Sequence, residues 1–352
     1  MKHVKGIDSI RCVAALWVVF GHGNRFPLTY GIDKGHWLGR IISGIYGNLF
    51  CGSAAVIVFF LISGFVIHYP YITGKTFVAS EFFLRRYLRI GFPLIVAIPL
   101  ARWVGIKLSL FSESILWSLF AELVYYSLYP AIRWAVKRTG WRIMLAGAYA
   151  ASVCVILTAP TASAYPSYGT SLNWLLGLPC WLLGCLLAES WSTEGRGEVS
   201  PISTTEIYSW RLTAWALTWA CSALRFHSPI GLPWTLNLFA IFAFFWLKKE
   251  IAYYNTTNRL PSRLLEWMGA WSYSLYLTHN LSRRLLVNYI GAPNLGVFLN
   301  WLVLMSFMLC FAYLFFLLFE KTSHLLARSL AQRLRRPQAS HSAPIIGQID
   351  AA

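Results

Sequence analysis

Arg11 and His22 are the first residues in this sequence whose types and spacing could do chemistry. If one α-helix joins them, their separation turns His22 to within about 20° of Arg11, about 16 Å further along the axis. Because imidazole titrates near neutral pH, His22 could act as a general base that faces a wet cavity. The alternative is that Arg11 extends to lipid headgroups while His22 caps the end of the helix.

Glu122 is the second candidate, within the apolar stretch that runs from Trp117 to Tyr126. A carboxylate in apolar surroundings must be paired or protonated. It could orient His22 and stabilise its imidazolium form, or it could bind substrate hydroxyl groups. The alternative is that Glu122 neutralises a basic residue of a neighbouring helix and so fixes the packing.

Three arginines, Arg85, Arg86 and Arg89, form the third candidate. Residues three apart share a helical face, so we expect Arg86 and Arg89 to point the same way. Two guanidinium groups on one face suit the phosphate oxygens of a nucleotide-like ligand in the cytosol. The alternative is that these residues anchor the protein to lipid phosphates.

Hydroxyl groups and one further histidine give weaker signals. Ser63 precedes Gly64, and Ser272 begins a stretch that ends at His279. Small residues let membrane helices approach closely, so a packing role is the alternative for both serines. The seven cysteines form no ligand pattern, so we predict buried apolar side chains and no metal site.

The composition determines which elements must position these residues. Of the 352 residues, 57% are hydrophobic and 12% are charged, whereas a soluble domain has about 25% charged residues. This composition excludes a soluble enzyme, a secreted disulfide scaffold and a disordered chain. We predict an all-α polytopic membrane protein with about ten transmembrane helices. The predicted segments are 7–23, 50–69, 91–108, 115–133, 143–159, 173–188, 211–225, 234–248, 267–285 and 296–319.

The basic residues predict the orientation of these segments. With both termini in the cytoplasm, 22 of the 30 Lys and Arg residues lie on the cytoplasmic side, as short basic loops do. This placement accounts for the net charge of +17 without nucleic acid. We predict one membrane domain over residues 1–322, and a cytoplasmic tail over 323–352 that is first basic and then disordered. The basic part should meet anionic lipids.

Motifs in a fixed order give the chain a resemblance to a known family. They are Asp8-Ser-Ile-Arg11, Arg11 and His22 with ten residues between them, Phe59-Phe-Leu-Ile-Ser63-Gly-Phe65, Arg86-Tyr-Leu-Arg89, Trp117-Ser-Leu-Phe-Ala-Glu122 and Ser272-Tyr-Ser-Leu-Tyr-Leu-Thr-His279. Over roughly residues 5–320 the chain resembles the acyltransferase 3 family, bacterial inner-membrane proteins that O-acetylate surface polysaccharides and related glycans.

The resemblance implies an acyl-CoA donor, with acetyl-CoA expected, that enters from the cytoplasm, and a carbohydrate acceptor at the outer side. It implies that Arg86 and Arg89, helped by Arg85, hold the phosphates of the donor. His22 would take the hydroxyl proton with Glu122 orienting it, and Arg11 would lie near the thioester or the pantetheine arm. The residues expected to line the passage are Ser63, Trp117, Ser118, Ser272 and His279.

No permanently bound cofactor is expected, and polysaccharide-assembly proteins are expected partners. Two other functions stay open from the residues alone. A transporter or flippase of a lipid-linked sugar would also place charges inside a helix bundle, often with internal repeats, which this sequence lacks. A non-catalytic scaffold for polysaccharide assembly would leave the common face of Arg11 and His22 unexplained.

Overall fold

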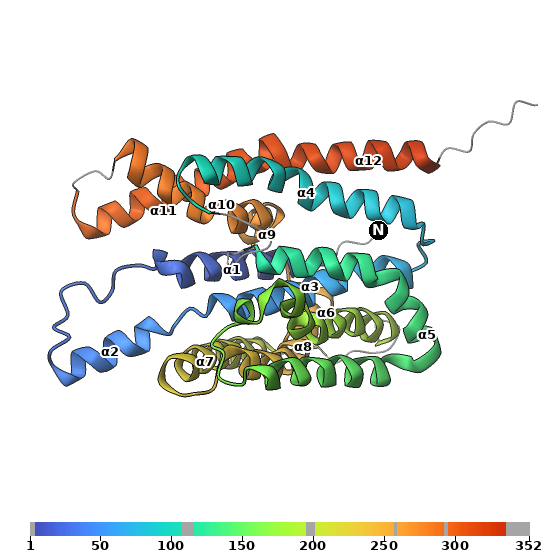
Figure 1. Cartoon of the computed structure of the whole chain (residues 1–352), viewed down its shortest axis with the longest axis horizontal. Coiled ribbons are helices and arrows are strands. Elements are labelled where there is room, and N and C mark those ends of the chain that lie inside the picture. Colours follow the sequence, from blue (N-terminus) through green and yellow to red (C-terminus); the bar gives the residue numbers. More distant parts are fainter. Residues whose placement is uncertain (1–3, 108–115, 195–200, 257–258, 292–294, 336–352) are drawn as a thin grey trace, which may run out of the picture.

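The computed structural model of this chain describes residues 4–107, 116–194, 201–256, 259–291 and 295–335. Every regular element within these ranges is helical, which confirms the predicted all-α class. The first described residues and the end of the last helix lie toward the same end of the molecule (Figure 1).

The helices are named in chain order. They are α1 (Ile7–Val19), α2 (Trp37–Gly47), α3 (Gly52–Ile72), α4 (Ala79–Trp103), α5 (Trp117–Thr158), α6 (Gly169–Glu194), α7 (Thr204–His227), α8 (Leu232–Thr256), α9 (Arg263–Ala270), α10 (Ser272–Leu285), α11 (Val297–Phe315) and α12 (Lys321–Arg335). Wider, π-helical turns follow α1 at Phe20–Asn24 and α10 at Leu286–Ile290, and a third at Phe316–Glu320 joins α11 to α12.

Each predicted membrane segment falls mainly on one of these helices. By length and apolar composition, four helical stretches among the described residues are able to cross a membrane: 37–72, 117–158, 165–192 and 297–333. The number of ten spans and the cytoplasmic side of the termini therefore stay predictions. The protein is a helical membrane protein in which several of the shorter helices pack against these four.

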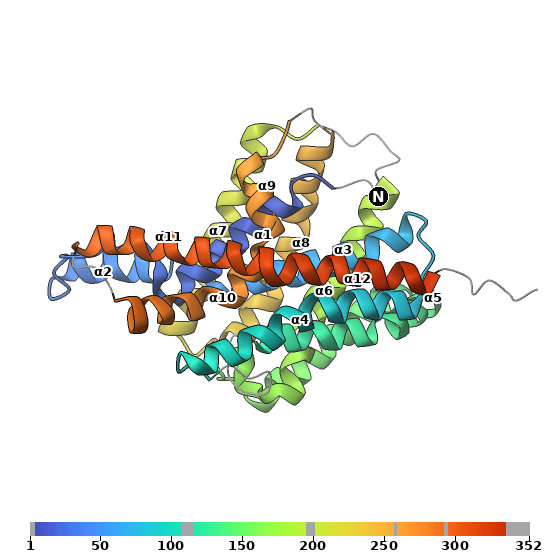
Figure 2. The same cartoon turned by 90° about the horizontal axis from the view of Figure 1, so that it is seen from above.

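Two regions differ from the prediction. Helix α2 lies in a region that was not expected to be helical. Helix α4 begins at Ala79, so the three arginines lie within a helix and not before it. The reason is that residues 79–90 contain no Pro and many good helix formers. Residues 321–335 continue as α12 beside α4 (Figure 2), so the basic part of the predicted tail is helical, and 336–352 lie outside the described residues.

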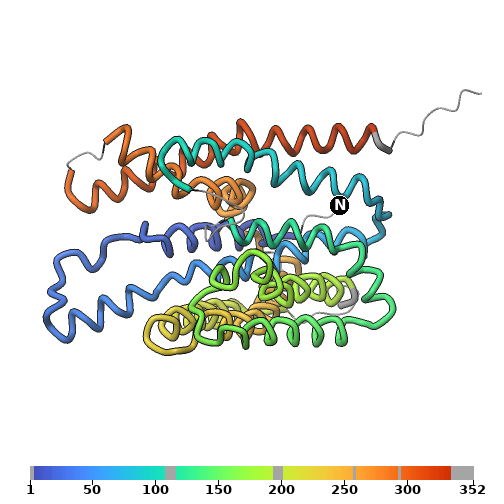
Figure 3. The backbone as a smooth tube through the Cα atoms, in the orientation of Figure 1, coloured from blue at the N-terminus to red at the C-terminus, as the bar shows by residue number. Residues whose placement is uncertain are grey.

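Helix α5 carries two predicted segments because the chain turns back within it. Gly140 has a φ of +80°, a conformation that glycine adopts without a steric cost. Figure 3 shows the two halves running in opposite directions on either side of this turn. The first half carries Glu122 toward the centre of the molecule, and the second half packs on the outside.

Helices α3 and α6 approach closely because each carries a glycine at the contact. A Cβ atom on Gly64 would lie 2.1 Å from the carbonyl oxygen of Trp181, and one on Gly184 would lie 2.0 Å from that of Leu61. Small residues allow such contacts between membrane helices. This close contact brings the indole of Trp181 beside Ser63, so it also determines the geometry of the site.

The prediction that the cysteines are buried is wrong for two of them. Cys154 and Cys310 are exposed, and the other five are buried. The physical reason is that the outer face of a membrane helix meets lipid, so an apolar side chain there need not be covered by protein. All seven cysteines are free thiols in the structure.

Candidate active site

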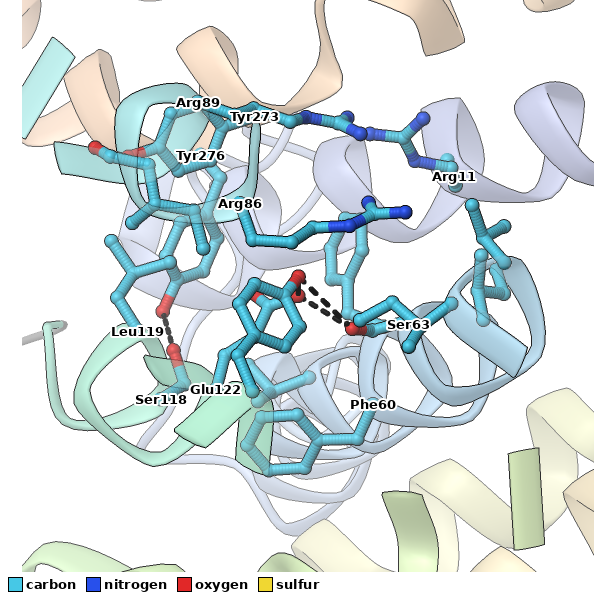
Figure 4. Close-up of a pocket in the computed structure, with 17 residues that line it drawn as sticks. Arg11, Phe60, Ser63, Arg86, Arg89, Ser118, Leu119, Glu122, Tyr273 and Tyr276 are labelled. Atoms are coloured by element: carbon cyan, nitrogen blue, oxygen red, sulfur yellow. Dashed lines mark hydrogen bonds between the residues drawn. The ribbon is translucent and has the colours of Figure 1, made fainter. Parts of the chain in front are cut away.

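A cavity of about 100 Å³ lies where α1, α3, α4, α5 and α10 meet. Four of these helices contribute polar side chains that were predicted from the sequence, and two tyrosines of α10 complete the polar wall (Figure 4). The polar residues that line it are Arg11, Ser63, Arg86, Arg89, Ser118, Glu122, Tyr126, Tyr273 and Tyr276. The structure therefore brings together residues that lie far apart in the sequence.

Three guanidinium groups face this cavity. Arg89 and Arg11 extend toward one another from α4 and α1, and Arg86 lies between them and Ser63 (Figure 4). Arg11 is paired with Asp8 at 3.1 Å. Among the described residues, no carboxylate lies within ion-pair distance of Arg86 or Arg89. Such a cluster of cations favours an anionic ligand with several oxygens, such as phosphate.

Glu122 is held by hydroxyl groups at the opposite wall. Its Oε1 accepts a hydrogen bond of 2.6 Å from Ser63 Oγ and another from the hydroxyl of Tyr126, one turn along α5. Ser63 Oγ in turn accepts a hydrogen bond of 3.3 Å from the indole of Trp181. The Arg86 guanidinium lies 6.0 Å from the ring centre of Tyr126. The network therefore places a carboxylate and an arginine across one small space.

His22 lies outside the wall of this cavity. The regular helix ends at Val19, and His22 lies in the wider turn that follows, before Gly23 with a φ of +84°. Because the helical geometry changes after Val19, Arg11 and His22 do not share the helical face that their spacing predicted. His22 Nδ1 donates a hydrogen bond of 2.8 Å to the carbonyl oxygen of Val18. The side chain is exposed.

The predicted contact between His22 and Glu122 is wrong for this structure. Among the described residues, no hydrogen bond or ion pair joins the two, and the carboxylate is bonded to Ser63 and Tyr126. His22 lies beside His279 of α10, with 4.9 Å between the ring centres. The sequence could not show this, because the pairing depends on how α1 and α10 pack.

The remaining predicted residues divide into two groups. Ser63 and Ser118 line the cavity, and Ser118 shares a hydrogen bond of 2.7 Å with the hydroxyl of Tyr276. Trp117, Ser272 and His279 are buried between helices and do not line it. Trp117 packs edge-on against Phe60, with ring centres 6.0 Å apart.

Arg85 does not contribute to this cavity. Its guanidinium lies 3.0 Å from the carboxylate of Glu81, one turn earlier in α4. A one-residue step along a helix turns a side chain by about 100°, so Arg85 points away from the face that carries Arg86. The helper role that the resemblance implied for Arg85 has no support from its position.

Sequence reasoning missed one charged residue near the site. Glu320 is fully buried, and its Oε2 accepts hydrogen bonds from the backbone and the hydroxyl of Ser274, at 3.2 and 2.6 Å. Ser274 directly follows Tyr273, which lines the cavity. The signal was present, because Glu320 directly follows the last apolar segment, and a carboxylate in such a place is a candidate by default.

A second cavity, of about 340 Å³, lies on the other side of α1. Ile10, Val13 and Trp17 line it, and its walls are mainly apolar. Arg211 and Glu250, which form an ion pair with contacts of 2.7 and 2.9 Å, also line it. Helix α1 thus separates an apolar cavity from the one that Arg11 faces.

Comparison with known proteins identifies the class of this protein. The family model described as an acyltransferase domain, of the acyltransferase 3 family, matches residues 4–317. The chain therefore belongs to this family, as its motifs indicated, and it is a membrane acyltransferase. No curated protein and no solved structure matches the chain.

Proposed function

We propose that this membrane acyltransferase moves an acetyl group from cytosolic acetyl-CoA to a hydroxyl group of a cell-surface carbohydrate, in the inner membrane of a bacterium. The observation that carries the proposal is the cluster of Arg11, Arg86 and Arg89 around one small cavity. Coenzyme A carries phosphate groups, and arginine binds phosphate through paired hydrogen bonds. We expect Arg86 and Arg89 to hold these phosphates, because no carboxylate among the described residues forms an ion pair with either guanidinium group.

We expect Arg11, which pairs with Asp8 at 3.1 Å, to lie near the thioester of the donor or the pantetheine arm that leads to it.

His22 is the general base of the proposed reaction. Its Nδ1 donates to a carbonyl oxygen, so the neutral ring has a free lone pair at Nε2. The sugar oxygen attacks the thioester carbon while His22 takes the hydroxyl proton. The new C–O bond forms, the C–S bond breaks, and the coenzyme A thiolate leaves and then takes up a proton. Ser63 and Tyr126 hold the Glu122 carboxylate in the wall of the cavity. In the proposed reaction Glu122 therefore helps to shape the part of the site that binds the donor, and it does not orient His22.

Acyl transfer by the purified protein in lipid nanodiscs tests this proposal. We expect acetyl-CoA and a bacterial surface glycan to give free coenzyme A thiol and a glycan heavier by one acetyl group in mass spectra. Octanoyl-CoA is the matched donor control and should react far more slowly. Thiol release without any modified glycan, or movement of a lipid-linked sugar without thioester consumption, would contradict the proposal, and the second result would favour a transporter.

A further inference from the structure

Three aromatic rings surround the guanidinium group of Arg133 in α5. Its central carbon lies 5.2 Å from the ring centre of Tyr71, 4.9 Å from that of Phe77 and 5.9 Å from that of Tyr129. The rings come from the end of α3, from the connection to α4 and from α5 itself. A cation over an aromatic face is attracted to it. The rings therefore fix the guanidinium group, while the side chain stays partly exposed.

The charge of Arg133 is not neutralised by an ion pair. No carboxylate among the described residues lies within ion-pair distance of it. Lys75 lies over the same Tyr71 ring, at 5.6 Å, but its ammonium group pairs with Glu81 at 3.1 Å. A guanidinium group that is held in place and has no anionic partner suits the oxygens of a phosphate group.

A continuous aromatic cluster joins Arg133 to the arginines of the cavity. The Arg86 guanidinium lies 6.0 Å from the ring centre of Tyr126. The rings of Tyr126 and Tyr129 both contact Phe82, with ring centres 6.4 and 5.1 Å apart, and Phe82 lies one turn before Arg86 in α4. From Tyr126 to Arg133, α5 rises by about 10 Å. Arg133 therefore follows Arg86 along the contact between α4 and α5, toward the end of the molecule that the basic residues predict to be cytoplasmic.

Coenzyme A carries phosphate at two places. A diphosphate joins the pantetheine arm to the ribose, and a separate 3′-phosphate is attached to that ribose. The acyl end of the donor would enter the cavity, so its nucleotide would extend toward the cytoplasmic end. A phosphate monoester offers three oxygens and a charge of about −1.5 to −2 near neutral pH.

We infer that Arg133 binds the 3′-phosphate of the donor, while Arg86 and Arg89 bind the diphosphate. The three rings hold the Arg133 guanidinium in place before the donor arrives, so less freedom is lost on binding. This inference rests on the proposed function and extends it by one binding residue, about three turns of helix from Glu122.

Acetyl-3′-dephospho-CoA isolates this contact, because it differs from acetyl-CoA only by the 3′-phosphate. We expect the wild-type protein in phosphatidylcholine nanodiscs to bind acetyl-CoA about 10-fold more tightly than this analogue, as a charge-assisted hydrogen-bonded pair allows. Arg133→Gln keeps a polar side chain but removes the charge. It should bind both donors equally, with about the affinity of the wild type for the analogue. Equilibrium binding of both donors to one preparation gives the ratio.

Arg138→Gln is the matched control on the same helix. Arg138 is exposed and lies 3.9 Å from the ring centre of Trp134, and a step of five residues turns it by about 140° from Arg133. This variant should keep the full preference for acetyl-CoA. Misfolding would lower both affinities of a variant together, so it would not by itself remove the preference.

Three results would overturn the inference. Equal binding of the two donors by the wild type would show that Arg133 contacts lipid phosphate or solvent instead. A preference that survives in Arg133→Gln, or one that is lost equally in Arg138→Gln, would place the 3′-phosphate elsewhere. In each of these cases acetyl-CoA still binds, so the proposed function stands. Binding of neither donor would overturn the proposed function together with the inference.

Discussion

Ser63 of α3 donates a hydrogen bond of 2.6 Å to Glu122 of α5, across the cavity wall from Arg86. The bond joins two helices whose residues lie far apart in the sequence, and Tyr126 and Trp181 extend it into a network. The Glu122 carboxylate thus lines the same cavity as the arginines. His22 and His279 form a separate polar pair at the end of α1.

Loss of the Glu122 carboxylate should destabilise the protein. Glu122→Ala leaves the hydroxyl groups of Ser63 and Tyr126 without their acceptor in a part-buried site. We expect a loss of about 1–3 kcal/mol in the free energy of unfolding. Glu122→Gln keeps an amide oxygen as acceptor and is the matched control, with less than half of that loss. Thermal unfolding in detergent measures both, and equal stability of Glu122→Ala and wild type would show that the network does not hold these helices.

His22 should affect the rate without affecting donor binding. A positioned general base contributes about 10²–10⁴-fold to a rate, and His22 does not line the cavity with the arginines. We therefore expect His22→Ala to lower kcat by a factor in this range while the affinity for acetyl-CoA stays within about threefold of wild type. Kinetics and equilibrium binding on the same preparation give the two quantities. Normal glycan acetylation by this variant would rule out His22 as the base.

The contact between α3 and α6 should tolerate no side chain at Gly184. A Cβ atom there would lie 2.0 Å from a backbone oxygen of α3, which cannot rotate away. We expect Gly184→Ala to lower the free energy of unfolding by about 1–3 kcal/mol or more, as overpacking does. The control is Gly147→Ala in α5, where a Cβ atom meets nothing within 4 Å. Helix propensity favours alanine there, so that variant should be at least as stable as wild type.

Phosphate should dominate the affinity for the donor. Acetyl-pantetheine carries the same thioester as acetyl-CoA but lacks the nucleotide with its phosphates. We expect it to bind at least about 100-fold more weakly, because charge-assisted bonds to two arginines are lost. Competition against acetyl-CoA measures the difference, and raising the salt concentration should weaken only the binding of acetyl-CoA. Equal binding of the two compounds would place the donor elsewhere.

The arginine pair could be predicted from the sequence, and the histidine pair could not. Arg86 and Arg89 share a face in any regular helix, so their local spacing was sufficient to predict that both line one cavity. The prediction for His22 assumed a regular helix as far as that residue, but α1 ends at Val19 in a wider turn. Its neighbour His279 comes from α10, and no local pattern reports such a contact.

The tyrosines of the site were missed for a different reason. Tyr126 and Tyr276 bond to Glu122 and Ser118 in the cavity wall. Tyrosine is common at membrane interfaces, so its presence in an apolar segment does not by itself indicate a site. The fold class was predictable because composition and apolar runs define it, whereas the number of spans depends on how helices such as α9 and α10 lie in the membrane.

Binding of acetyl-CoA to the protein in nanodiscs tests whether the cavity between α1, α4 and α5 holds the phosphates of the donor through Arg86 and Arg89. We predict that Arg86→Ala with Arg89→Ala weakens binding by at least about 100-fold, whereas Arg85→Ala, whose side chain pairs with Glu81, leaves it within about threefold. An unchanged affinity in the double variant would contradict the claim and would make these arginines membrane anchors.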